Sequence, residues 1–93
     1  MSSTTLKTQQ VDEKQNILLD VTDVMRTVFK QPSLVVERST TASNVKGWDS
    51  LNHVALIIAI EAFYKIRFRA SEIAKLQNVG ELVDLIDRRL VKP

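Results

Sequence analysis

The sequence predicts an all-α protein, a four-helix up-down bundle with three longer helices, one short helix and a long loop between the first two helices. Three observations favour this fold class. Apolar residues recur at helical spacing in three separate stretches of the chain. Only two glycines and two prolines are present, which leaves little material for the tight turns of an all-β fold. Helix-forming Leu, Ala, Glu, Lys and Arg dominate the second half.

A chain of 93 residues suits a single domain, and its start differs in composition from the rest. Residues 1–15 are rich in Ser, Thr, Gln and Lys without a sustained apolar period, so we expect a flexible N-terminal tail there. A first amphipathic helix should follow, because one apolar stripe begins at once. Its members are Ile17, Leu18, Val21, Val24, Met25, Val28 and Phe29. Pro32 should end this helix, since it pushes Gln31 away from the α region.

A long connection over residues 31–49 separates the first two predicted helices. Loops of this length are uncommon in compact domains unless they are anchored or functional. Leu34, Val35 and Val36 are candidates to anchor this loop on the core, whereas the polar residues after them should face solvent.

The second helix should begin at Asp49 or Ser50, because both side chains can accept a hydrogen bond from unpaired backbone amides at a helix start. Gly47 supplies a flexible turn just before. The expected core positions of this helix are Leu51, Val54, Ile57, Ile58 and Ala62. Further apolar residues lie between them, and such a helix is either largely buried or presents an apolar surface to partners.

The remaining chain contains one extended segment and two helices. Ile66 and Phe68 alternate with basic residues, which we interpret as a linker that turns two apolar side chains inward. A short helix is expected over residues 71–76. Asn78 should cap the last helix, with Glu81 three residues later in a capping-box-like arrangement. The expected buried stripe of that helix is Val79, Leu82, Val83, Ile86 and Leu90.

Composition excludes several kinds of chemistry. The absence of cysteine excludes disulfides, thiolate metal sites and a cysteine nucleophile. The single histidine, His53, argues against an all-protein zinc site, and we expect this side chain to be solvated. No apolar run is long enough for a membrane span, so a cytoplasmic protein is expected. A net charge of +2 from scattered basic residues does not favour nucleic-acid binding.

Residues 47–51, Gly-Trp-Asp-Ser-Leu, resemble the attachment motif of acyl carrier proteins. Val54, residues 60–68 and residues 78–86 resemble the continuation of that family in register, without gaps. The resemblance implies an acyl carrier domain over residues 16–93. In that family the serine of the motif opens the second helix and accepts 4'-phosphopantetheine from coenzyme A, which points to Ser50 here.

The resemblance further implies a protein that catalyses nothing itself and carries acyl intermediates as thioesters. Expected partners are a phosphopantetheinyl transferase and acyl-loading and acyl-processing enzymes, acting on a monomer. Asp49, Leu51 and Glu61 are the candidates for partner recognition. Family members open a cavity among their helices for the acyl chain. Five apolar residues that we expect in the core could also line this cavity: Val54, Ile58, Phe68, Leu76 and Ile86.

The sequence departs from the family in charge, since typical members carry many acids on the second helix. Asn52, His53, Ala55 and Ala62 stand where acids are common, and the linker is basic. Standard fatty-acid enzymes should therefore recognise this chain poorly, and we expect a specialised lipid, polyketide or cell-envelope pathway. The alternatives are a peptidyl or aminoacyl carrier, an interaction subunit whose Ser50 stays bare as a mere helix cap, a small nucleic-acid binder, and a Ser50–His53 hydrolase.

Overall fold

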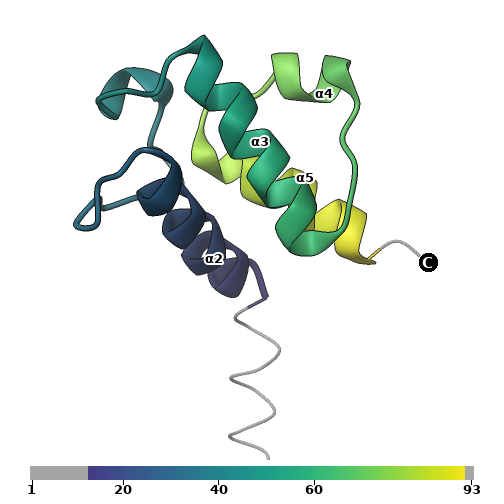
Figure 1. The fold of residues 1–93 in the computed structure, drawn as a ribbon. Coiled ribbons are helices and arrows are strands. Elements are labelled where there is room, and N and C mark those ends of the chain that lie inside the picture. Colours follow the sequence, from purple (N-terminus) through teal and green to yellow (C-terminus); the bar gives the residue numbers. More distant parts are fainter. Residues whose placement is uncertain (1–12, 92–93) are drawn as a thin grey trace, which may run out of the picture.

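A computed structural model describes residues 13–91 as a helical bundle (Figure 1). Within this range the helices are α2 (Glu13–Val28), α3 (Ser50–Tyr64), α4 (Ala70–Ala74) and α5 (Val79–Val91), with a short 3-10 turn at Ala42–Asn44. The prediction of three longer helices, one short helix and a long loop between the first two is confirmed. Figure 1 shows α2 beside α3 and α5, with α4 at the end of the bundle where α3 begins.

Two predicted boundaries shift by a few residues. Helix α2 already includes Glu13, Lys14 and Gln15, which the sequence assigns to a flexible tail; the rest of that tail lies outside the described residues. An acidic side chain in the first turn favours this helix start, and the Lys14 ammonium lies 3.2 Å from an Asp84 carboxylate oxygen on α5. The short helix α4 begins and ends earlier than predicted.

The core is formed by one stripe from each of the three longer helices and by Val45 of the long loop. The predicted stripe of α2 is confirmed, since Ile17, Val21, Met25 and Phe29 are buried and its other members pack partly buried against the core. Along α5 the stripe is confirmed except at its end, where Leu90 is 40% exposed. The buried α5 residues are Val79, Leu82, Val83, Leu85 and Ile86.

The face of α3 that meets the core differs from the prediction. Of the five expected core positions only Ile57 is buried, and it is joined by Leu56 and Ile60. Leu51, Val54, Ile58 and Ala62 are instead exposed. Because apolar residues surround this helix on all sides, their spacing does not select a face, and packing against α2 sets the rotation of the helix.

Helices α2 and α3 are each followed by a lysine in the left-handed region. Lys30 has φ 57° and Lys65 has φ 58°. The amide that follows each lysine donates to a carbonyl five residues back, Gln31 to Arg26 at 3.0 Å and Ile66 to Glu61 at 3.1 Å. This closure satisfies carbonyls that a helix end leaves without partners.

The long loop is tied to the bundle by apolar contacts and by its backbone. Leu34 and Val36 pack against the core as expected, whereas Val35 is 73% exposed. The carbonyls of Thr40 and Arg38 accept hydrogen bonds from the Val79 and Gly80 amides, at 2.9 and 2.8 Å.

In the linker between α3 and α4, Ile66 and Phe68 turn inward onto the core, which confirms the predicted linker.

No helix in the described range is both long and apolar enough to cross a bilayer.

Candidate functional site

The start of α3 is fixed by Asp49, which leaves the neighbouring serine hydroxyl outside the capping arrangement. Asp49 is the N-cap, and its Oδ1 accepts a hydrogen bond from the Asn52 amide at 2.9 Å. The Asn52 side chain in turn donates to the Gly47 carbonyl at 2.6 Å, across a turn in which Gly47 has φ +86°. Ser50 is the first helical residue and is exposed. A second protein can therefore reach its hydroxyl on a rigid element.

The amides of Ser50 and Leu51 belong to the first turn of α3, so they have no intrahelical acceptor. These N–H groups form the positive end of the helix dipole, close to the Ser50 hydroxyl. An anion placed on Ser50 would gain about 0.3–1 kcal/mol from that dipole at an exposed site. The local geometry therefore suits a phosphate ester better than an uncharged group.

An aromatic cluster supports the turn before α3. The Trp48 indole N–H donates to His53 Nδ1 at 3.0 Å, and the two rings stack with centroids 6.0 Å apart. Phe29, at the end of α2, packs on the other side with a centroid distance of 5.8 Å to Trp48. The expectation of a solvated His53 is thus wrong, since the ring is partly buried and burial lowers its pKa. The bond from Trp48 requires the neutral imidazole with its proton on Nε2.

A cavity of about 590 Å³ opens beside Ser50, between α3, α4 and the start of α5. Two of the five residues expected to line an acyl pocket, Val54 and Leu76, are in its wall. The other three are not: Ile58 is 59% exposed on the outer face of α3, Phe68 packs partly buried against the core, and Ile86 is fully buried within it. The complete lining is Ala42, Trp48, Asp49, Ser50, His53, Val54, Ile73, Ala74, Leu76, Gln77, Asn78 and Leu82.

Several lining residues escape the sequence reasoning. Ile73 and Ala74 lie on α4, and Leu82 lies on α5. Helical periodicity signals the burial of Leu82, but no sequence signal shows that the short helix stands off α3 far enough to leave a hollow. The position of α4 relative to α3 depends on tertiary packing, which helical periodicity does not encode.

The three residues predicted to recognise partners occupy two separate regions. Asp49 and Leu51 flank Ser50, and Leu51 is 78% exposed. Glu61 lies in the last turn of α3, where its carboxylate accepts a hydrogen bond from the Phe68 amide at 2.9 Å. This side chain therefore also holds the linker against the helix.

The described residues do not support a hydrolase or a metal centre. His53 Nδ1 is engaged by Trp48, and no hydrogen bond joins His53 to the Ser50 hydroxyl within residues 13–91. A serine nucleophile requires that contact to lose its proton. The same range contains no group of three His, Cys, Asp or Glu side chains that could hold a metal ion.

Comparison with known proteins finds a similar solved structure. No protein-family model matches the chain. The solution NMR structure of a holo acyl carrier protein from Geobacter metallireducens is similar, with a TM-score of 0.76 and 44% sequence identity. The match covers 80% of this chain and 85% of that protein.

Proposed function

Because the chain belongs to the acyl carrier protein family, we propose that it carries acyl intermediates as thioesters on 4'-phosphopantetheine attached to Ser50. One observation carries the assignment of the residue. The Ser50 hydroxyl is exposed at the first position of α3, and Asp49 performs the capping that would otherwise occupy it.

The residues around Ser50 fit the phosphate of such a group. Ser50 Oγ provides the ester oxygen, and the amides of Ser50 and Leu51 face the anion from the helix end. When bound, the group supplies a flexible thiol, which this cysteine-free chain lacks. The protein itself catalyses nothing: its residues place the hydroxyl, balance the charge of the ester and present the attached arm to enzymes.

The cavity beside Ser50 is the proposed shelter for the acyl chain. Its volume of about 590 Å³ lies within the range of ordinary ligand sites, and Val54, Ile73 and Leu76 give its wall an apolar character. Of the other residues expected to line this pocket, Phe68 and Ile86 contribute by packing in the core behind it, whereas Ile58 faces outward.

The proposed partners are a phosphopantetheinyl transferase, with coenzyme A as donor, and acyl-loading and acyl-processing enzymes that meet a monomer. Asp49 and Leu51 border the attachment site, and Glu61 marks the far end of α3. Glu61 is the only acidic residue within α3. This scarcity of acids supports a specialised lipid, polyketide or cell-envelope pathway, acting in the cytoplasm, over standard fatty-acid synthesis.

The function is tested by loading the purified protein. Incubation with a promiscuous phosphopantetheinyl transferase and coenzyme A should add the mass of one phosphopantetheine group. Replacing coenzyme A with acyl-coenzyme A should add an acyl group that hydroxylamine removes. Ser50→Ala should abolish both gains, whereas Ser43→Ala, at an exposed serine of the long loop, should change neither. A wild-type chain that gains no mass would favour the interaction-subunit alternative.

A further inference from the structure

The outer face of α3 is an exposed apolar stripe that begins beside Ser50. Leu51, Val54 and Ile58 are 78%, 54% and 59% exposed, and their spacing of three and four residues places them on one face. Ala55 and Ala62 are exposed as well and extend that face. A 15-residue helix is roughly 22 Å long, so the stripe runs along much of one side of the domain. Contiguous exposed apolar surface of this kind marks an interaction site.

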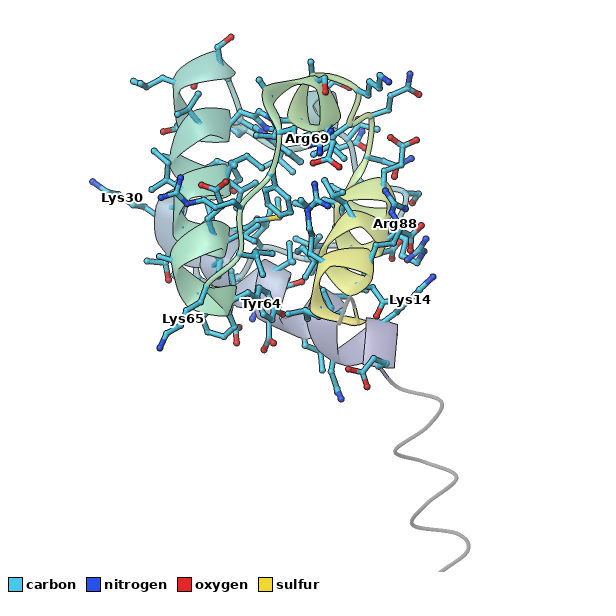
Figure 2. All side chains as sticks on the ribbon, turned by 90° about the vertical axis from the view of Figure 1, so that its right-hand side faces the viewer. Lys14, Lys30, Tyr64, Lys65, Arg69 and Arg88 are labelled. Atoms are coloured by element: carbon cyan, nitrogen blue, oxygen red, sulfur yellow. The ribbon has the colours of Figure 1, made fainter. Side chains whose placement is uncertain are left out.

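The far end of the stripe is bordered by two cations. Lys65 ends α3 in its left-handed conformation, and Arg67 follows in the linker. Both line a surface hollow of about 530 Å³ together with Ile58 and Ala62 of the stripe and Ile66 of the linker. Figure 2 shows Lys65 extending outward from the end of α3, and Lys30 extending to the same side of the molecule.

Two carboxylates at this end of the bundle accept hydrogen bonds within the fold. Glu61, which also lines the hollow, accepts a hydrogen bond from the Phe68 amide, and Asp20 accepts one from the Tyr64 hydroxyl at 2.7 Å. Within the described part of the chain, Lys65 and Arg67 form no ion pair. The cations at this edge are therefore available to an outside partner.

Two arginines elsewhere in the fold are held by carboxylates of the same chain. Arg38 pairs with Asp84 at 2.9 Å, and Arg89 pairs with Glu72. These two arginines have carboxylate partners within the chain, whereas Lys65 and Arg67 have none among residues 13–91 and lie directly beside the apolar stripe.

We propose that the exposed face of α3 and the adjoining Lys65–Arg67 edge dock a carrier-dependent enzyme whose pantetheine tunnel is bordered by carboxylates. This inference rests on the proposed function, since the enzyme must reach the arm on Ser50. The apolar stripe forms the water-excluding centre of the contact, and the cations form its rim. Rim charges act mainly on the rate of encounter and on the choice of partner, so this edge selects acidic enzymes over basic ones.

The charge at this edge suits a protein better than an anionic membrane. Recognition of a charged bilayer requires clusters of roughly four to eight Lys or Arg residues. This edge has only two cations, Lys65 and Arg67. They lie beside an apolar stripe long enough to cross an ordinary protein interface, which buries about 800 Å² per partner.

The test uses one condensing enzyme in two forms. The first has lysines and arginines around its tunnel, and in the second these are replaced by glutamates. The full-length chain is loaded at Ser50 with an electrophilic pantetheine analogue that alkylates the active-site cysteine, and mass spectrometry confirms complete loading. Cross-linking rates are then compared at low and high salt for the wild type, the K65E/R67E variant and the K75E/R88E variant.

The K75E/R88E variant is a matched control. It changes the net charge by the same amount, and its two cations line a separate hollow between α4 and α5. Figure 2 shows Arg88 on α5, on the opposite side of the view from Lys65. Circular dichroism of all variants checks that each retains the helical fold.

We expect the wild type to cross-link the acidic form about tenfold faster than the basic form at low salt, with the preference fading as salt rises. K65E/R67E should reverse the preference, and K75E/R88E should keep it. The inference is overturned if the basic form is preferred, or if both double variants shift the rates equally. It is also overturned if phosphatidylglycerol vesicles, rather than the acidic enzyme, retain the wild type and not K65E/R67E. Failure to load Ser50 at all would instead refute the proposed function.

Discussion

Asp49 and Ser50 are both good capping residues, and the fold uses only one of them for that purpose. The Asp49 carboxylate accepts the Asn52 amide, while Ser50 is the exposed first residue of α3. The sequence narrows the helix start to this pair but does not decide between them. In the folded chain the Asn52 side chain also donates to the Gly47 carbonyl, so the turn and the capped helix start are joined.

This division predicts unequal effects of two alanine substitutions. Asp49→Ala should lower the free energy of unfolding by about 1 kcal/mol, because an N–H at the helix start loses its acceptor. Ser50→Ala should change it by less than about 0.5 kcal/mol, as for an ordinary surface position. Urea unfolding followed by circular dichroism measures both. Equal losses would show that Ser50 shares the cap, which the account does not allow.

His53 gives the domain a pH-dependent stability. Burial lowers the pKa of His53, so the folded protein binds fewer protons at this ring than the unfolded chain does. The resulting contribution is complete above the ordinary histidine pKa of about 6.5 and is lost as the pH falls through that value toward the lower pKa of the folded state. Protonation also removes the acceptor for the Trp48 indole.

We therefore expect a lower melting temperature at pH 5.5 than at pH 7.5, accompanied by a change in the fluorescence of Trp48, the only tryptophan of the chain. His53→Gln should flatten the dependence over this interval, because His53 is the only histidine. A His53→Gln variant with the same pH profile as the wild type would contradict this assignment.

At the scale of the elements, the helices were predictable and their orientations were not. Local signals locate α2 and α5, since each has a single apolar stripe. Helix α3 offers apolar residues all round, so the sequence cannot show that Leu56 and Ile60 turn inward while Leu51 and Ile58 turn outward. The cavity beside Ser50 depends on that rotation and on the position of α4, which explains why only Val54 and Leu76 were identified in its wall.

The end of α3 carries a conformational strain that a substitution can relieve. Lys65 has φ 58° and ψ 48°, a region that disfavours side chains with a Cβ atom. Lys65→Gly should therefore be more stable than Lys65→Ala by about 1 kcal/mol, although both variants lose the same charged side chain. The comparison of their chemical unfolding curves isolates the backbone effect. If alanine is equally stable, the left-handed end of α3 is not present in solution.

At the scale of the whole molecule, one small core supports the entire domain. Domains of this size have a free energy of unfolding of about 5–15 kcal/mol, so a single core truncation removes a large share. Ile86→Ala, at a fully buried position, should cost about 2–5 kcal/mol. Ile58→Ala, which makes the same chemical change at a 59% exposed position, should cost less than about 1 kcal/mol. Similar losses at the two sites would mean that α3 is rotated relative to the arrangement described.

The fold and the surface charge of this domain could not be predicted equally well from the sequence. Members of a family can share a bundle and an attachment serine while differing in the charge that they present. Here the fold and the motif at Ser50 could be predicted from the resemblance, whereas the uneven distribution of charge could not. Pairing within the fold neutralises Arg38 and Arg89 and leaves Lys65 and Arg67 exposed, and such pairs join residues far apart in the sequence.

The central claim is that one hydroxyl, that of Ser50, receives the prosthetic arm. Trypsin digestion of the loaded protein should release residues 47–65, a peptide whose only serine is Ser50 and which contains no threonine. Tandem mass spectrometry should find the phosphopantetheine mass on this peptide, with fragment ions that place it on Ser50 and none on the other serines of the chain. A modified peptide from elsewhere in the sequence, or an unmodified 47–65 peptide from fully active transferase reactions, would contradict the account.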